Sequence, residues 1–356
     1  MKPPVITAVT AWVPEAIPLS RWTAIESALR ATGHPGWDAW MRSWHPDYGH
    51  WLEAGAGEET GGSRPVHSGV PTPDVTCMVP VETGTDLSGL AVKVANALCA
   101  ARPPDARPVD VIVFCHSSLD EHVSTTVAGR LCAEVGTPCF PFSVSQQHGV
   151  SPFTALRLAA DLLVAEPHIH TILIVAAEKW CPPFSRMCGT CMVHGDAAGA
   201  MLVERTDPGT GGVHLLDVAA RHVPVDMVCG DAGVADARTF PLLSMIDSLL
   251  ARHGLHDENV NDVVGHPGIP SLTAAVSDLL GRPDTGVQHE DCVHLGAAES
   301  IVRLAQILNR AACGRRHRAL LWGYGTGGFI GTALLGMHGA PSLPISKTRS
   351  SPSHDP

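Results

Sequence analysis

The sequence of 356 residues is 45% hydrophobic and carries 24 Lys and Arg against 35 Asp and Glu, a formal charge of -11. This length predicts two domains or one large duplicated domain, and an acidic balance without any basic run argues against a nucleic-acid partner. The longest apolar runs are far shorter than the ~20 residues that cross a bilayer, and the opening MKPPVITAVTAW lacks the apolar segment of a signal peptide, so a cytoplasmic protein with no membrane partner is expected.

The first half of the chain alternates predicted helices with apolar strands. Residues 44–75, with Gly, Pro and scattered charges, predict an irregular excursion that covers a pocket. Asp86 is placed to cap a helix whose apolar residues between Leu87 and Leu98 recur with the 3.6-residue period. The strand DVIVFCH follows and ends at His116. Further on, HTILIVAAE predicts a buried strand and GDAAGAMLVE a turn into another.

Between these strands, SVSQQHGVSPFTALRLAADLL at 143–163 predicts a strand, a sharp turn and a helix. Enzymes often place a nucleophile on such a turn because the helix dipole favours negative charge there. The turn offers His148 and no cysteine. Ser151 precedes the proline that opens the helix, which is typical of an N-cap, and a capping hydroxyl is committed to backbone amides. We therefore expect Ser151 to cap the helix rather than act as a nucleophile.

The second half repeats this order. Leu242, Met245, Leu249 and Leu250 keep a helical period, and HDENVN leads into the strand DVVGH, which ends at His266. RALLWGYGTGGFIGTALLGM then predicts two strands joined by a glycine-rich turn. Repeated apolar strands between helices indicate mostly parallel sheets covered by helices in two similar halves. The polar tail at 339–356 is expected to be disordered.

Most of the 11 cysteines lie in apolar runs, where a thiol packs as a small hydrophobic group. The exception is CGTCMVH, in which Cys188, Cys191 and His194 have the close spacing of metal ligands. A structural zinc site usually needs a fourth protein ligand, and the sequence has no second CxxC or HxxxH to supply it. The segment is therefore expected to be a loop beside a pocket, with no metal.

Taken in order, the motifs resemble those of the ketoacyl-ACP synthase III branch of the thiolase superfamily. FSVSQQHGVSPFTAL is similar to the nucleophile turn of that family, DVVGHPGIPSL to its histidine motif, and WGYGTGGFIG to its final glycine loop. The resemblance implies an α/β fold, the thiolase-like duplicated αβαβα five-layered sandwich. It also implies an N-terminal half at 1–205, a C-terminal half at 206–338, and a homodimer formed through a central sheet.

The resemblance carries over only in part to the catalytic residues. In that family a cysteine accepts the acyl group from coenzyme A or acyl carrier protein, and a histidine and an asparagine help the second substrate react. The nucleophile position falls on His148 or Gly149, and neither is a cysteine. His266 matches the catalytic histidine, but the asparagine position falls on Leu295. Two of the three family groups are therefore absent.

His294 stands beside the missing asparagine, and Glu299 follows five residues later. Some family relatives that acylate natural-product scaffolds pair a histidine with an acid in this way, and a carboxylate that orients an imidazole makes a general base. The alternative is a capping contact at a helix start. By resemblance, the amides of Gly149 and Gly325 would form an oxyanion hole, with Ser151 beside them as a substrate-binding candidate.

The first hypothesis is an acyltransferase of specialised metabolism, which moves an acyl group from a coenzyme A or carrier-protein thioester to a small-molecule hydroxyl, amine or carbon acceptor. It would use a ternary complex, no cofactor and no cysteine acyl-enzyme, with His148 donating a hydrogen bond or moving a proton. Acyl transfer through His148 itself is a less favoured alternative, since acyl imidazoles hydrolyse readily. Two other hypotheses remain open: a catalytically degenerate partner of an active ketosynthase III-like subunit, and a thioester-binding or hydrolytic protein.

Overall fold

The computed structural model describes residues 3–22, 77–120, 126–136, 139–181, 186–188, 192–205, 211–224, 236–266, 268–283, 293–310, 317–325, 327–339 and 341. The predicted irregular excursion at 44–75 lies outside these ranges, as does Cys191. The predicted disordered tail at 339–356 also lies outside them except for residues 339 and 341.

The described elements agree with the predicted ones in type and order. Asp86 caps α4 as predicted, accepting a hydrogen bond from the Gly89 amide at 2.6 Å. The helices are α4 (Leu87–Ala100), α5 (Val127–Val135), α6 (Ser151–Ala165), α7 (Thr239–Arg252), α8 (Pro270–Leu280) and α9 (Glu299–Arg310), with short 3-10 turns η2 (His148–Val150), η3 (Asp257–Asn259) and η4 (Gly296–Ala298). The strands are β1 (Val5–Trp12), β2 (Ala16–Pro18), β3 (Met78–Pro80), β4 (Val111–His116), β5 (Phe140–Ser145), β6 (Thr171–Glu178), β7 (Met187–Cys188), β8 (Met192–His194), β9 (Ala197–Glu204), β10 (Gly212–His222), β11 (Asp262–Val264), β12 (Val293–His294), β13 (His317–Tyr324) and β14 (Phe329–His338).

Nine strands form a continuous sheet in the order β11-β13-β14-β10-β1-β9-β6-β4-β5. Its two arms repeat one pattern outward from the centre, because β10, β14, β13 and β11 follow the same sequence of directions as β1, β9, β6 and β4. In the described part of the chain the arms join at the start of β1, where Val5 and Ile6 pair with His214 and Val213 and the Leu215 amide donates to the Pro4 carbonyl. This topology agrees with the expected duplication, and the exact boundary between the halves at 205/206 stays a prediction.

The expectation of mostly parallel pairing is wrong. Within this sheet, parallel pairing occurs between β4 and β5, β4 and β6, and β11 and β13, while the other neighbours are antiparallel. Continuous apolar strands indicate burial on both faces, which a layered sandwich gives to antiparallel strands as well. The apolar runs therefore correctly indicate that the strands are buried, but they do not determine whether neighbouring strands run parallel or antiparallel.

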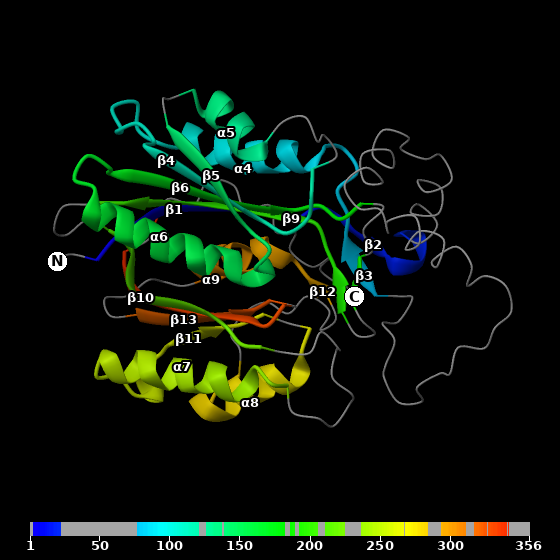
Figure 1. Cartoon of the computed structure of the whole chain (residues 1–356), viewed down its shortest axis with the longest axis vertical. Helices are drawn as coiled ribbons and strands as arrows, with labels where there is room; N and C mark the ends of the chain where they lie inside the picture. The colour runs from blue at the N-terminus through cyan, green and yellow to red at the C-terminus, as the bar shows by residue number, and fades with distance from the viewer. Residues whose placement is uncertain are drawn as a thin grey trace, which may run out of the picture.

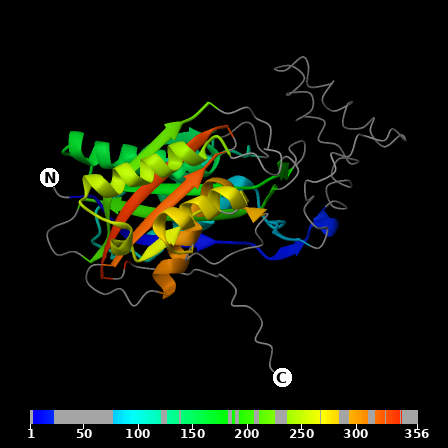
Figure 2. The same cartoon turned by 90° about the horizontal axis from the view of Figure 1, so that it is seen from below.

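Five layers stack in Figure 1: α4 and α5, one arm of the sheet, α6 and α9, the other arm, and α7 and α8. Three buried hydrophobic clusters fill the spaces between these layers. Figure 2 shows α7 and α8 lying across the outer face of their sheet arm. The central α9 is buried from Glu299 to Leu308, including its polar residues. Among the described residues, no helix has the length and apolar character needed to span a membrane.

The contact between β9 and α9 depends on a glycine. A Cβ at Gly199 would lie 2.6 Å from Cγ2 of Ile301, closer than carbon atoms approach in proteins, and the Ile301 side chain is fully buried. The central helix therefore sits against the sheet at a distance that only glycine allows.

We expect Gly199→Ala to lower the free energy of unfolding by about 1–3 kcal/mol, because the added methyl overpacks a closed interface. Urea denaturation monitored by circular dichroism measures the change. Gly327→Ala is the control, since the nearest atom to its added Cβ would be 3.6 Å away. Equal stability of the two variants would contradict this account of the α9 contact.

Candidate active site

The turn between β5 and α6 is strained at the residue predicted to replace the nucleophile. His148 has a φ of 52° and Gln146 a φ of 65°, in the left-handed region that non-glycine residues rarely adopt. The His148 amide donates to Ser117 Oγ at 3.0 Å, which ties the turn to the loop after β4. Strained residues of this kind gather at functional sites, where the surrounding fold holds them in place. The fold therefore holds the His148 side chain in a fixed position at this turn.

Ser151 does not cap α6, so that prediction is wrong. The helix begins at Ser151 itself, its N-cap residue Val150 makes no side-chain cap, and Ser151 Oγ is buried without a hydrogen-bond partner among the described residues. The cause is η2, which runs directly into α6 and removes the extended residue that a cap requires. The role of this hydroxyl as a substrate-binding group stays a prediction.

Four buried histidines come together beside this turn. His148 comes from η2, His266 follows β11, and His194 and His294 end β8 and β12. The last two are paired in register in the small parallel ladder of β8 and β12, which sets them side by side. Residues from both halves of the sequence therefore form one cluster.

The ring of His148 packs against two of the other histidines and against Trp180. Its centroid lies 4.7 Å from that of His294, 4.8 Å from that of His194 and 6.2 Å from that of Trp180. His148 is buried, with 5% of its surface exposed. Neither of its ring nitrogens has a hydrogen-bond partner among the described residues. Buried polar atoms are nearly always paired, and unpaired ones occur where a ligand, water or reaction uses them.

The hydrogen bonds of His294 and His266 show which nitrogen of each neutral ring carries the proton. His294 Nδ1 accepts a hydrogen bond from the Gly296 amide at 2.8 Å, so a neutral His294 carries its proton on Nε2. That nitrogen lies 3.2 Å from His266 Nδ1 and donates to it. His266 then carries its proton on Nε2, which is buried and without a partner among the described atoms. The cluster thus presents an unused N–H on His266 and an unused nitrogen lone pair on His148.

Two glycines make room for His266. A Cβ at Gly149 would lie 2.5 Å from the His266 ring, and a Cβ at Gly323 would lie 2.7 Å from it. The imidazole is therefore held between the backbone of the nucleophile turn and the backbone of β13. This close approach places His266 against η2, the turn that carries His148.

The predicted contact between His294 and Glu299 is absent from the described structure. Glu299 Oε2 accepts the Leu295 amide at 2.7 Å, and its Oε1 accepts Arg303 Nε at 2.7 Å within α9. At the first position of a helix, the carboxylate meets a residue four positions on and the backbone behind it. Glu299 therefore acts at the helix start, as the alternative prediction held, and His266 takes its place beside His294.

The structure does not support the prediction that the Gly325 amide is an oxyanion donor. Its amide donates to the Phe329 carbonyl at 2.8 Å in the turn between β13 and β14, and its carbonyl accepts from Arg238. A donor already paired in this way is not directed at a substrate oxygen. Gly149 lies in η2 next to His148 as predicted, and its role as a donor stays a prediction.

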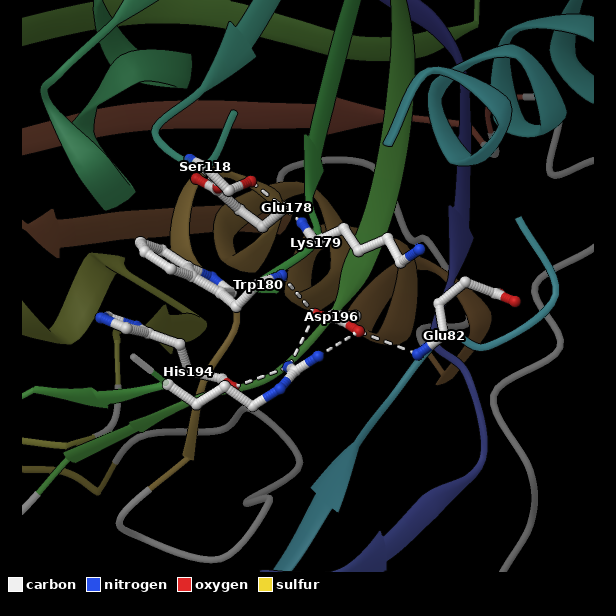
Figure 3. Close-up of polar contacts among 8 residues, drawn as sticks. Glu82, Ser118, Glu178, Lys179, Trp180, His194 and Asp196 are labelled. Carbon is white, nitrogen blue, oxygen red and sulfur yellow. Dashed lines mark hydrogen bonds and ion pairs between the residues drawn. The ribbon is translucent and has the colours of Figure 1, made fainter. Parts of the chain in front are cut away.

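His194 was not among the predicted catalytic residues, and the structure places it in the cluster beside Trp180. Its ring stacks on Trp180 at 4.1 Å and 12°, and buried Asp196 forms two 2.7 Å bonds with Arg186 close by. Asp196 also accepts the amides of Trp180 and Glu82, as Figure 3 shows. The expectation of a loop at CGTCMVH is wrong in its described part, because Cys188 ends β7 and Met192–His194 form β8. The pairing of β8 with β12 then brings His194 to the site.

Glu178 fixes the part of the site that orients His294. The buried carboxylate accepts the Ser118 amide at 2.7 Å and the Ala297 amide at 3.0 Å (Figure 3 includes the first). Ala297 lies in η4, next to the Gly296 amide that binds His294. Burial raises the pKa of Glu178. One carboxylate thus joins the loop after β4 to η4.

Burial keeps the imidazoles of the cluster neutral. It lowers the pKa of His148 to about 4, with a smaller effect from the Arg238 charge. Burial is also the main cause that lowers the pKa values of His194, His266 and His294 well below the usual value. At neutral pH these rings act as neutral donors and acceptors.

The nitrogens of His148, His194 and His294 lie within 4.8 Å of one another, a distance from which small shifts would let them bind a divalent metal. A metal-bound histidine usually donates its other N–H to a carboxylate or carbonyl. His294 instead accepts an amide N–H at that position, and the second nitrogens of the other two rings face no such acceptor among the described residues. These contacts fit proton transfer better than metal binding.

Comparison with known proteins gives consistent matches. The family model for 3-oxoacyl-[acyl-carrier-protein] synthase III matches residues 146–222. The β-ketoacyl-[acyl-carrier-protein] synthase III of Rhodospirillum rubrum is 26% identical over 251 residues, which cover 62% of this chain and 75% of that protein. The matches to relatives from two Rickettsia species span 66% of their length.

Solved structures support the same fold over nearly the whole chain. The acyltransferase ChlB3 has a TM-score of 0.67 at 19% identity, with 97% of this chain and 100% of that chain covered. The 3-oxoacyl-(acyl carrier protein) synthase III from Pseudomonas aeruginosa PAO1 has a TM-score of 0.66 at 18% identity, with 96% and 100% covered.

We expect stability to fall as the pH drops from 6.5 toward 4. In this window an unfolded histidine with a pKa of 6.5 binds a proton that folded His148, with a pKa of about 4, does not bind. His148 alone then removes up to about 3 kcal/mol of the free energy of unfolding, and the other three rings add to the effect. Above pH 6.5 this contribution is fully present.

Thermal unfolding between pH 5 and 8 measures the slope for the wild type and for His148→Asn, because asparagine tolerates a positive φ. The variant should lose less stability on acidification than the wild type. Removing the exposed His168 by His168→Asn is the control and should leave the slope unchanged. Parallel slopes for the wild type and His148→Asn would argue against a buried neutral His148.

Proposed function

Because the chain is a ketoacyl-ACP synthase III-like protein of the thiolase superfamily, we propose that it is an acyltransferase in which neutral histidines do the work of the missing cysteine. The observation that carries this proposal is a pair of unused groups in the buried cluster: the lone pair of His148 on the strained turn, and the Nε2–H of His266, whose ring packs against that turn. Direct acyl transfer needs a base and a hydrogen-bond donor, and the cluster holds one of each.

The proposed reaction has one tetrahedral intermediate and no acyl-enzyme. His148 takes the proton from the acceptor hydroxyl or amine as that atom attacks the thioester carbonyl. The developing oxyanion accepts a hydrogen bond from His266 Nε2–H. The contact with His294 keeps the proton of His266 on that nitrogen. When the C–S bond breaks, the leaving thiolate takes the proton from His148. Because burial disfavours the charged form of His148, the proton passes on quickly and the ring returns to neutral.

His148 is also poorly suited to carry the acyl group. An imidazole of low pKa is a good leaving group, so an acyl adduct on it would react with water or acceptor at once. Direct attack within a ternary complex avoids that loss and relies on positioning, which contributes roughly 7 kcal/mol or more in favourable cases. This supports the hypothesis of transfer without a covalent intermediate.

The substrates that we propose are an acyl thioester of coenzyme A or acyl carrier protein and a small-molecule acceptor of specialised metabolism. The similarity to ChlB3, which is described as an acyltransferase, supports this class. A homodimer is also proposed: β5 forms an outer edge of the sheet, and its Phe140 is 68% exposed, which suits pairing with a second copy.

We expect sequential kinetics and no stable acyl adduct. In a screen of acyl-coenzyme A donors against hydroxyl and amine acceptors, initial-rate plots should intersect, because both substrates must be bound before transfer. Intact mass after incubation with the donor alone should equal the mass of the untreated protein. Parallel plots together with an acylated peptide containing His148 would refute the direct mechanism, and activity only with a cysteine-bearing homologue would support the degenerate-partner hypothesis.

The two histidines should respond differently to substitution. His148→Asn removes the base and should lower kcat by about 10²–10⁴-fold. His266→Gln keeps an N–H donor, whereas His266→Ala removes it, so His266→Ala should lose about 10²-fold or more and His266→Gln less. The control His168→Asn should retain full activity. Equal losses in His266→Gln and His266→Ala would mean that His266 does not act as a donor.

A further inference from the structure

A pair of cysteines lies far from the histidine cluster, at the edge of the sheet. Cys132 is in the last turns of α5, and Cys139 directly precedes β5. The two Sγ atoms are 2.8 Å apart, with Cys139 donating to Cys132. Cys132 Sγ also approaches the Cys139 carbonyl at 3.6 Å. The fold therefore brings two thiols together that the sequence separates by six residues.

This separation is shorter than an ordinary contact between two thiols, which is roughly 3.5 Å or more for a weak S–H donor and acceptor. Both side chains are half-buried and pack at the margin of the hydrophobic cluster under α4 and α5. A small reagent can thus reach them, while neighbouring packing keeps them together. Cys115, by contrast, is fully buried and lies in a different cluster.

From this geometry we propose that Cys132 and Cys139 are a modification site, a dithiol that a low-molecular-weight disulfide converts to an intramolecular disulfide. The Cys132 sulfur attacks one sulfur of the reagent and releases the first reagent thiolate. The Cys139 sulfur, after losing its proton, attacks the Cys132 sulfur of the mixed disulfide and releases the second. Two protein thiols lose two protons and two electrons, and the reagent disulfide is reduced to two thiols.

The bond would tie two structural elements together at one corner. It joins the C-terminal turn of α5, which ends at the left-handed Gly136, to the start of the edge strand β5. The closed loop is short, so the gain from restricting the unfolded chain is moderate. Burial and the bond to Cys132 raise the pKa of Cys139 to about 12. The second step should therefore be slow at neutral pH and accelerate with rising pH.

The test is incubation of the full-length protein with oxidised glutathione, followed by intact mass and peptide mapping. The wild type should lose about 2 Da, with a cross-link between the Cys132 and Cys139 peptides, and its melting temperature should rise by about 3 °C. Cys139→Ser should instead accumulate the glutathione adduct on Cys132 and show no rise. Cys99→Ser is the matched control from the same cluster and should behave as the wild type.

Reduction with dithiothreitol should reverse both changes in the wild type. The proposal is overturned if the wild type keeps these two thiols or takes up one glutathione on each, or if the mass loss persists in Cys139→Ser. Because the readouts are mass and melting temperature, the result does not depend on the proposed acyl transfer.

Discussion

The hydrogen bond from the Gly296 amide to His294 Nδ1 determines how the site holds its protons. Since a backbone N–H is only a donor, the neutral ring must place its own proton on the other nitrogen, and that choice passes to His266. Glu178 secures the backbone on which this depends by binding the next amide in η4. A buried carboxylate, two amides and two imidazoles thus define a direction of hydrogen bonding that ends at the unused Nε2–H of His266.

Burying four polar side chains between the layers of the fold would be costly if the side chains were charged. Neutral imidazoles avoid the large penalty of burying charge, whereas the nearby charged pairs, Arg186 with Asp196 and Arg303 with Glu299, neutralise themselves locally. The charges therefore serve to position backbone and rings. The strained turn at His148 adds a further cost, which the rigid junction of β5, η2 and α6 sustains.

Much of the fold could be predicted from periodicity and the order of motifs. The cap at Asp86, the helices α4, α6 and α7 and the buried strands that follow them were predicted from local patterns. Strand direction was not, because burial on both faces produces the same apolar runs in either direction. His266 and His294 were found by resemblance. Local spacing misled at Ser151 and Glu299, where a 3-10 turn and the i to i+4 geometry of a helix decided the contacts. His194 required knowledge of which strands pair.

That pairing has a consequence for how such a site tolerates change in evolution. His194 and His294 face the cluster together because β8 and β12 are in register at both of their shared positions. Since side chains alternate between the faces of a strand, a single-residue insertion or deletion within β8 would turn its imidazole to the opposite face. Natural variation in length should therefore be found outside this short ladder, while point substitutions elsewhere in the site can be absorbed one at a time.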